Sequence, residues 1–401
     1  MENPLVTVVS RPGEADRVVA GHPWIYAASI LRATQPPEDG SLVQVKDHRQ
    51  RLLGVGFFNS KSKIQVRLIH TERVEVNQAF FEERIRAALA LRQRFMPEAT
   101  SFRVINSESD LLTGLIVDKY EDVIVLQTSS LGMDLRKHHI VAALQKVFKP
   151  RSILERNETA SRKFEGLEAV SGVLAGEPVE SIDVRINGLK FTVDLRDGHK
   201  TGMYLDQQVN HHLVAGLAKD ANVLDCFTFL GGFAIPAAKA GARQVLGIDQ
   251  SESAINAART HAVLNGVSDI ATFEVGNVFD WLKGHTTTGP NDRLLARFDL
   301  IILDPPSFTR NRASVGDALR GYKEIHVRAL KLLKPGGKLV TFCCSHHVDT
   351  KLFEDVALSA AFDQRRLLRR IATYSQSPDH PILPSIPETE YLKGAAYELV
   401  R

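Results

Sequence analysis

A strand, a turn with adjacent glycines, a helix and a second strand follow one another near the middle of the chain. The apolar run 221–225 is short, rich in β-forming residues and ends in the carboxylate of Asp225, as buried strands of parallel sheets often do. Residues 234–240 then predict a helix, and residues 244–248 predict a second strand that leads into Asp249. This order indicates a doubly wound α/β domain, in which ligands bind at the carboxyl ends of the strands.

Asp225 and Asp249 stand where a nucleoside-containing ligand would meet such a unit. They are 24 positions apart, close to the roughly 20-residue spacing at which a carboxylate reaches a ribose hydroxyl. The turn at Gly231 lacks the Gly-x-Gly-x-x-Gly pattern, so a dinucleotide is not favoured. S-adenosylmethionine suits this arrangement, because Asp225 could help to hold its cationic amino-acid tail. Any doubly wound domain can carry a glycine turn and an acid, so this pattern alone leaves the cofactor open.

A further predicted strand leads into the sequence Asp304-Pro305-Pro306. Residues 298–303 are almost continuously apolar, which places Asp304 at the carboxyl end of a buried strand. The two prolines hold the backbone that follows in an extended turn. A rigid acidic group suits chemistry on the flat ring of a nucleic-acid base, although an exposed Asp that merely ends a strand would have the same sequence.

Two adjacent cysteines follow the next predicted strand, residues 339–342. Because successive side chains of a strand point to opposite faces, at most one of Cys343 and Cys344 is expected to face the pocket. A thiolate that adds to carbon 6 of a pyrimidine makes carbon 5 nucleophilic enough to take a methyl group, and Asp304 is the candidate acid for ring nitrogen 3. A free cysteine is more often a buried apolar residue, and Cys226 fits that alternative.

Six ordered motifs resemble one known family over essentially the whole chain. They are His22-Pro23-Trp24, residues 198–207, residues 225–227 with 231–233, Asp304-Pro305-Pro306-Ser307-Phe308, Thr341-Phe342-Cys343-Cys344-Ser345, and Asp379-His380-Pro381 followed by Tyr391-Leu392-Lys393-Gly394. With them the chain resembles the RlmI-type class I S-adenosylmethionine-dependent RNA methyltransferases, which make 5-methylcytosine in large-subunit ribosomal RNA. The resemblance implies that Cys344 is the nucleophile and that Cys343 is a spectator.

The resemblance also implies which residues bind S-adenosylmethionine. They are Lys200, Thr201, Tyr204, Gln207, Asp225, Phe227, Gly231, Asp249, Asn277 and Asp304. Two positions depart from the family: Gln208 stands where an arginine is usual, and Asn277 stands where an acidic residue commonly meets the adenine. An amide can replace that contact by donating or accepting a hydrogen bond.

Three domains are expected. Residues 1–75 contain short strands with turns between them, which predicts a small β barrel, and the resemblance implies a PUA domain, an RNA-binding module. Residues 76–180 alternate strands with helices over 79–95 and 131–148, which indicates an α+β domain. Residues 181–401 form the Rossmann-like methyltransferase domain, for which a mostly parallel seven-stranded sheet is implied. An Asn-Gly hairpin at 187–188 should open this domain, and an antiparallel pair should close it.

Basic residues predict where RNA would bind. The expected contacts are Arg49, Arg51, Lys61 and Lys63 in the first domain, and Arg310, Arg312, Tyr322 and Lys323 after the Asp-Pro-Pro turn. A solvated basic face would have the same sequence, so phosphate contact in the first domain is left open. The net charge of +3 is mild, so affinity for bulk nucleic acid should be modest and sensitive to salt.

The remaining features concern compartment and assembly. Three cysteines cannot form a set of disulfide pairs, which indicates a reducing compartment. Neither the cysteines nor the adjacent histidine pairs have the spacing of a metal site. No apolar run reaches membrane-spanning length and no signal segment is evident, so a cytoplasmic protein is expected. A homodimer is left open.

Two other functions are compatible with parts of the sequence. The Asp-Pro-Pro-x-Phe turn also resembles that of enzymes that methylate the exocyclic amine of adenine or guanine, which would not need Cys344. The chain could instead be a noncatalytic RNA-binding or ribosome-assembly factor that keeps the fold. In that case it would bind the cofactor without transferring a methyl group.

Overall fold

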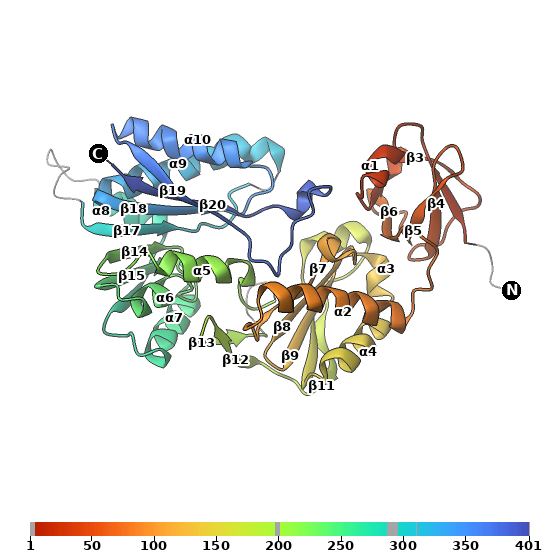
Figure 1. Cartoon of the computed structure of the whole chain (residues 1–401), viewed down its shortest axis with the longest axis horizontal. Helices are drawn as coiled ribbons and strands as arrows, with labels where there is room; N and C mark the ends of the chain where they lie inside the picture. The colour runs from red at the N-terminus through yellow and green to blue at the C-terminus, as the bar shows by residue number, and fades with distance from the viewer. Residues whose placement is uncertain (1–4, 197–200, 287–295, 310, 401) are drawn as a thin grey trace. The chain divides into compact units, whose positions relative to one another are not determined.

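The computed structural model describes residues 5–196, 201–286, 296–309 and 311–400 (Figure 1). Contacts divide the chain into two compact units. The first unit comprises residues 1–185, 193–205 and 378–389, and the second comprises residues 186–192, 206–377 and 390–401. The predicted first and second domains therefore lie in one unit. This unit also contains the later segments 193–205 and 378–389.

The first unit begins with a six-stranded sheet in the order β2-β6-β5-β4-β1-β3. Its strands are β1 (Thr7–Ser10), β2 (Trp24–Tyr26), β3 (Ile30–Ala33), β4 (Leu42–Lys46), β5 (Leu52–Phe58) and β6 (Ile64–His70), with the short helix α1 (Ala15–Val19). Val43, Val45 and Val66 lie at the centre of a small core of its own. The short strands β2 and β3 were not predicted, because three or four residues carry too little alternation to be recognised.

A second sheet in this unit has the order β11-β10-β9-β8-β7. Its strands are β7 (Phe102–Asn106), β8 (Leu115–Tyr120), β9 (Val123–Thr128), β10 (Ser152–Arg156) and β11 (Ser171–Gly176), and its helices are α2 (Gln78–Phe95), α3 (Leu131–Asp134) and α4 (Lys137–Phe148). Apolar side chains of α2 and α4, among them Phe81 and Ile140, pack with strand residues such as Ile124 in one core. The single helix predicted over 131–148 is wrong, since the chain interrupts it between Asp134 and Lys137.

The predicted Asn-Gly hairpin is confirmed. Strands β12 (Ser181–Ile186) and β13 (Leu189–Asp194) form a two-stranded sheet. Asn187 and Gly188 between them both have positive φ angles, 51° and 79°. This is the conformation that a two-residue hairpin turn requires, and it explains why asparagine and glycine stand there.

The second unit contains the predicted seven-stranded sheet, in the order β16-β15-β14-β17-β18-β20-β19. Its strands are β14 (Asn222–Cys226), β15 (Gln244–Asp249), β16 (Ala271–Val275), β17 (Phe298–Leu303), β18 (Leu333–Cys343), β19 (Leu368–Ser375) and β20 (Lys393–Leu399). The pairs from β16 to β18 are parallel, whereas β20 runs antiparallel to both β18 and β19. This arrangement confirms both the fold class and the antiparallel closing pair.

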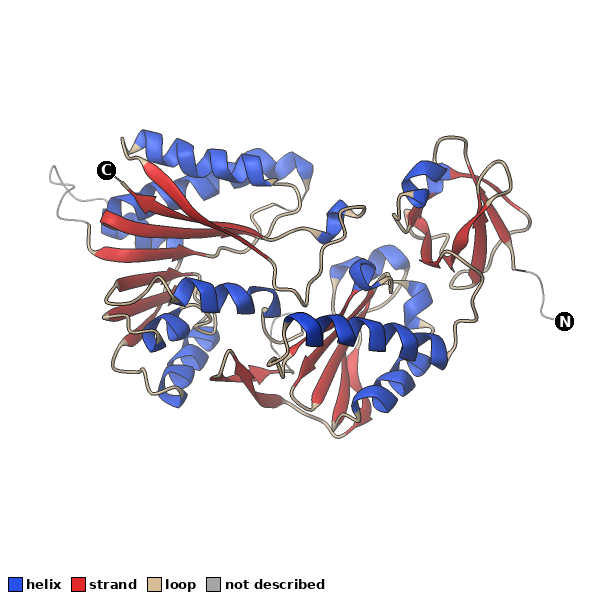
Figure 2. Cartoon of the chain, in the orientation of Figure 1, coloured by secondary structure: helices blue, strands red, loops and turns tan. Residues whose placement is uncertain are grey.

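Helices cover both faces of this sheet (Figure 2). They are α5 (Gln208–Ala215), α6 (Ala234–Lys239), α7 (Glu252–Leu264), α8 (Val278–Thr286), α9 (Val315–Leu332) and α10 (Thr350–Asp363). Helices α8 and α10 each pack against α9, and α5 packs against α6 (Figure 1). Tyr322, Ile325 and Phe353 pack with strand residues such as Ile301 and Leu339 in a large core. The sheet is therefore doubly wound, and its strand ends are the place for a ligand site.

No helix in the described ranges combines the length and the apolar character needed to cross a membrane.

Candidate functional site

The strand register brings the predicted site residues to one edge of the second unit's sheet. Cys226, the last residue of β14, pairs with both Ile248 of β15 and Leu303 of β17, and Leu303 pairs with Thr341 of β18. These strands therefore end close together, at the same edge of the sheet. The residues at or just after these strand ends include Phe227, Asp249, Asp304 and Cys344, so chain segments far apart in sequence share this edge.

Asp225 is completely buried beside the glycine turn. Its Oδ2 accepts a hydrogen bond of 2.6 Å from the Thr228 hydroxyl. Its Oδ1 accepts no hydrogen bond from the part of the chain that the structure describes. Burial raises the pKa of the Asp225 carboxyl to about 7, the Thr228 hydroxyl and the Ala234 amide oppose this rise, and the Asp249 carboxylate adds to it. A buried carboxyl group with an open acceptor is suited to a cationic ligand group.

The turn that follows β14 has an unusual backbone. Phe227, Phe229 and Gly231 all have positive φ angles, 67°, 50° and 83°. A Cβ added to the neighbouring Gly232 would lie 2.8 Å from the His211 ring, so no larger residue fits there without movement. The glycines thus allow a tight turn, with its amides near the strand end, where a ligand could approach the backbone.

Asp249 is the last residue of β15, and Asn277 follows β16. The Asp249 carboxylate accepts hydrogen bonds from the amides of Phe229 (3.0 Å) and Ser251 (2.9 Å), so it ties the glycine turn to the second strand. The side-chain oxygen of Asn277 accepts from the amides of Phe279 (2.9 Å) and Asp280 (3.3 Å) at the start of α8. Since that oxygen already caps a helix, the Asn277 amide nitrogen is the group that remains for an adenine.

Gln207 contacts the predicted acid directly. Its Nε2 donates a hydrogen bond of 3.1 Å to Oδ1 of Asp304, and its Oε1 accepts one of 2.6 Å from Asn210. Asn210 also donates to the carbonyl of Ser375 in β19 (2.8 Å). The resemblance implied Gln207 as a cofactor ligand, and that call stays a prediction. The observed contact also places its amide where it orients the Asp304 side chain.

The cysteines differ in exposure as strand alternation predicts. Cys343 is completely buried in the core at the end of β18, and Cys226 is also buried, whereas Cys344 is partly exposed. The Sγ atom of Cys344 lies 3.9 Å from the carbonyl oxygen of Pro305, in the turn that follows Asp304. The structure thus places the one thiol that can meet a substrate beside the Asp-Pro-Pro turn.

Three other predicted cofactor ligands belong to the first unit or lie outside the described residues. Lys200 is among the residues that the structure does not describe. Thr201 is buried, and its hydroxyl donates to the carboxylate of Asp118 at 2.6 Å, which is in turn paired with Arg103. Tyr204 is 37% exposed. Thr201 and Tyr204 belong to the first unit, and both stay predicted cofactor ligands.

The predicted RNA contacts near the Asp-Pro-Pro turn require a correction. Tyr322 is fully buried, with its ring 4.6 Å from that of Phe308 and 5.5 Å from that of Phe353, so it cannot stack on a base. It lies on the inward face of α9, and closeness in sequence to basic residues did not reveal that orientation. Lys323 pairs with Asp363 at 2.7 Å, and Arg312 is exposed. Arg310 is outside the described residues.

The basic residues of the N-terminal sheet are at the surface. Arg49, Arg51, Lys61 and Lys63 are all exposed, and Arg51 pairs with Asp47 at 3.2 Å. Their exposure is compatible with phosphate contact but does not by itself distinguish it from a solvated face.

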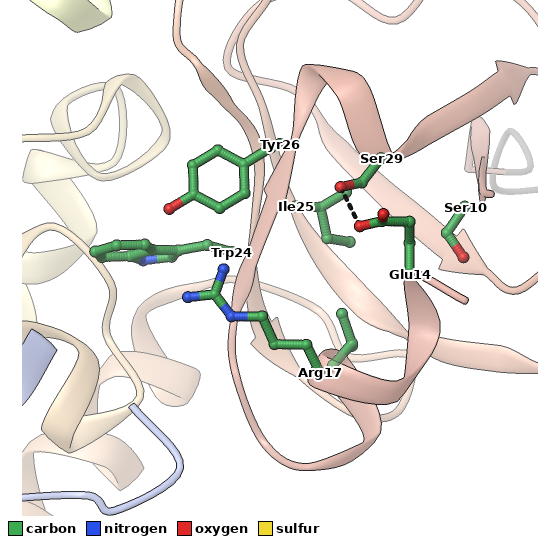
Figure 3. Close-up of a pocket in the computed structure, with 8 residues that line it drawn as sticks. Ser10, Glu14, Arg17, Trp24, Ile25, Tyr26 and Ser29 are labelled. Atoms are coloured by element: carbon green, nitrogen blue, oxygen red, sulfur yellow. Dashed lines mark hydrogen bonds between the residues drawn. The ribbon is translucent and has the colours of Figure 1, made fainter. Parts of the chain in front are cut away.

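A small pocket beside α1 and β2 was not predicted. Figure 3 shows Trp24, Tyr26 and Arg17 together, and Glu14 joined to Ser29 by a hydrogen bond of 2.6 Å. The Arg17 guanidinium lies 5.6 Å from the centre of the Tyr26 ring. The sequence motif His22-Pro23-Trp24 had indicated only a family resemblance. In three dimensions it places an indole beside a second aromatic ring and a cation.

Comparisons with known proteins agree with this fold. A family model described as S-adenosylmethionine-dependent methyltransferase matches residues 161–381, and a model of a PUA-like domain matches residues 9–71. A protein of Vibrio vulnificus named ribosomal RNA large subunit methyltransferase I is 38% identical over 395 residues, which cover 97% of this chain and 98% of the relative. A protein of the same name from Alteromonas mediterranea is 38% identical over 396 residues, 98% of each chain.

Solved structures show the same fold at lower identity. A methyltransferase structure with bound S-adenosylhomocysteine has a TM-score of 0.82 at 20% identity and covers 98% of this chain and 99% of that one. A second, a methyltransferase from Streptococcus mutans, has a TM-score of 0.81 at 20% identity with the same coverage. The family model matches more than half of the chain, and the relatives match nearly all of it. The chain therefore belongs to the S-adenosylmethionine-dependent methyltransferase family and carries a PUA-like domain in its N-terminal part.

Proposed function

We propose that this protein transfers the methyl group of S-adenosylmethionine to carbon 5 of a cytosine in large-subunit ribosomal RNA, in the cytoplasm, through a covalent adduct with Cys344. The observation that carries the proposal is the partly exposed Cys344 thiol at the end of β18, 3.9 Å from the Pro305 carbonyl in the turn after Asp304. Relatives that match the whole chain and are named for ribosomal RNA methylation support the substrate class.

The residues at the sheet edge suit the cofactor. The buried Oδ1 of Asp225 accepts no hydrogen bond from the described residues and would accept from the cationic amino group, and Asp249 would meet the ribose. The Asn277 amide would face the adenine, with Phe227 and Gly231 in the turn beside it. Lys200, Thr201 and Tyr204 remain proposed contacts that rest on the family resemblance. When bound, S-adenosylmethionine supplies an electrophilic methyl group.

The chain's own residues then carry the covalent chemistry. The Cys344 thiolate adds to carbon 6 of the cytosine, which forms a carbon–sulfur bond and moves the ring electrons toward carbon 5 and nitrogen 3. Asp304, oriented by Gln207 and in its protonated form, donates a hydrogen bond or its proton to nitrogen 3 and stabilises that charge. Carbon 5 takes the methyl group. Loss of the carbon-5 proton to a base then breaks the carbon–sulfur bond and returns the thiolate.

RNA would be held by exposed residues outside the site. Arg49, Arg51, Lys61 and Lys63 of the N-terminal sheet, and Arg312 and Lys323 near the Asp-Pro-Pro turn, remain the proposed contacts. Lys323 would have to exchange its ion pair with Asp363 for a phosphate. Tyr322 is no longer part of this proposal, because it is buried.

The test is transfer of labelled methyl groups to large-subunit ribosomal RNA that lacks its modifications, followed by nucleoside analysis. Wild type is compared with Cys344→Ala and with Cys343→Ala, the matched control at the adjacent thiol. S-adenosylmethionine binding by each variant serves as the check on folding. Labelled 5-methylcytidine that is lost in Cys344→Ala and retained in Cys343→Ala is the expected result. A labelled purine, or full activity of Cys344→Ala, contradicts the proposal.

The two rival functions have distinct outcomes in the same assay. An exocyclic-amine methyltransferase would use the Asp-Pro-Pro-x-Phe turn and label a purine. In this chain, however, the Phe308 ring of that turn packs 4.6 Å from Tyr322 and 5.6 Å from Phe279, which does not favour stacking on a flipped purine. A noncatalytic assembly factor would bind S-adenosylmethionine and transfer no label to any RNA.

A further inference from the structure

Lys393 is a buried lysine whose ammonium is held by backbone carbonyl groups. It is only 8% exposed, and its Nζ donates hydrogen bonds to the carbonyl oxygens of Ser345 (2.5 Å) and Tyr391 (2.9 Å). Within the described ranges it forms no ion pair. Buried lysines are rare unless paired, since removing an ammonium from water is costly. A charge held here by backbone carbonyls therefore needs a functional explanation.

The position of Lys393 relates it to the proposed nucleophile. Lys393 is the first residue of β20 and pairs in register with Cys343 of β18. The carbonyl that it holds belongs to Ser345, which directly follows Cys344. The lysine is thus anchored to the chain segment that carries the thiol, on the strand next to it in the sheet.

A second set of hydrogen bonds extends this anchor to the Asp304 turn. Ser345 is buried, and its hydroxyl is hydrogen-bonded to the Thr309 hydroxyl and accepts from the His347 amide at 3.3 Å. The Thr309 carbonyl accepts from the Ser307 hydroxyl at 3.2 Å. A continuous series of contacts from Lys393 through Ser345 to Thr309 therefore joins the thiol's segment to the turn that follows Asp304.

The titratable groups that act on Lys393 come from three segments: the end of β18, the residue before α10 and the loop before β20. Burial lowers the pKa of Lys393, while Cys343, Cys344, Glu390 and Asp349 act in the opposite direction. Interaction between a cation and a thiol is reciprocal: the thiolate stabilises the ammonium, and the ammonium stabilises the thiolate.

We propose that Lys393 is a positioning residue for Cys344: its ammonium holds the Ser345 carbonyl, fixes the segment that carries the thiol and stabilises the thiolate form. The inference rests on the proposed covalent function, because only a cysteine nucleophile must be ionised at neutral pH. No bond to Lys393 forms or breaks in the reaction.

The test measures the ionisation of Cys344 directly, by its rate of alkylation with iodoacetamide as a function of pH. Cys226 and Cys343 are buried, so Cys344 is the accessible thiol, and Cys344→Ala provides the blank. The variants are Lys393→Met, which removes the charge, Lys393→Gln, which can still donate to the Ser345 carbonyl, and Lys393→Arg, which keeps the charge. Lys351→Met, at a lysine that is 77% exposed on α10, is the matched control.

We expect alkylation at pH 7 to be about tenfold slower in Lys393→Met and Lys393→Gln, with the profile displaced to higher pH by about one unit. Lys393→Arg and Lys351→Met should keep the wild-type profile. In RNA methylation, the first two variants should lower kcat while leaving KM for S-adenosylmethionine near its original value.

The outcomes separate this inference from the proposed function. A wild-type alkylation profile in Lys393→Gln overturns the electrostatic role, even if Lys393→Met fails to fold. Wild-type profiles in both variants overturn the inference as a whole. Full methylation by Cys344→Ala would instead refute the covalent function, and that result is obtained without any Lys393 variant.

Discussion

Replacement of Asp225 by asparagine should make the cofactor-free protein more stable and weaken its binding of the cofactor. The carboxyl is fully buried, one of its oxygens accepts no hydrogen bond from the described residues, and burial raises its pKa to about 7 from an ordinary value of 3.8. In the unfolded chain the same group ionises near its ordinary pKa. The folded state therefore binds the proton more tightly, and its stability falls as pH rises from about 4 to about 7.

The magnitude follows from the difference between the two pKa values. A gap of about three pH units corresponds to about 4 kcal/mol of destabilisation above pH 7, of which about 2 kcal/mol develops between pH 5.5 and 7. The substitution Asp225→Asn removes this titration, and the new side chain can still accept from the Thr228 hydroxyl. An amide cannot make the charge-assisted hydrogen bond that the carboxylate makes to the cofactor's amino group, so S-adenosylmethionine should bind about 10- to 100-fold more weakly.

The assay is thermal and denaturant unfolding of wild type and Asp225→Asn at pH 5.5, 7 and 8.5, with calorimetric titration of S-adenosylmethionine at each pH. The variant's gain in free energy of unfolding without cofactor should increase from pH 5.5 to 7 and then level off. A gain that is equal at every pH would refute the argument that burial raises this pKa. Unchanged affinity for S-adenosylmethionine would refute the role of Asp225 as its ligand.

Three other substitutions probe contacts of the second unit. Gln207→Leu removes the hydrogen bond to Asp304, so kcat for RNA methylation should fall about 10- to 100-fold with little change in S-adenosylmethionine affinity; a loss of affinity alone would instead mark Gln207 as a cofactor ligand. Gly232→Ala brings a Cβ to 2.8 Å from the His211 ring and should lower the free energy of unfolding by about 1–3 kcal/mol, measured in urea; an unchanged midpoint would show that the ring moves freely. Tyr322→Phe removes a buried hydroxyl that has no hydrogen-bond partner among the described residues, so stability and RNA affinity should both stay within experimental error of wild type, and weaker RNA binding in a filter assay would restore Tyr322 as a contact.

Local patterns predicted those features whose physical cause lies within a few residues. Alternation along a strand separated Cys343 from Cys344, and the Asn-Gly pair specified a turn with two positive φ angles. The break in the helix predicted over 131–148 was missed, although its first part, Leu131–Asp134, contains a glycine and an aspartate, which are weak helix formers. Strand β11 was also missed, since its residues are mostly exposed and include glycines at both ends of the run 172–176.

The order of motifs along the chain predicted the doubly wound sheet, the cofactor class and the place of Asp304 and the cysteines at strand ends, because strand ends in such a sheet meet at one edge. The choice of Cys344 over Cys343 as nucleophile came from the family resemblance and stays a prediction. Only the tertiary structure decided which neighbours those groups have. Tyr322 is buried because it lies on the face of α9 that packs in the core. Gln207 contacts Asp304, which is 97 residues away in sequence. Lys393 lies beside the cysteines because the antiparallel strand β20 pairs with β18. These contacts depend on packing between distant segments, which no spacing along the sequence encodes.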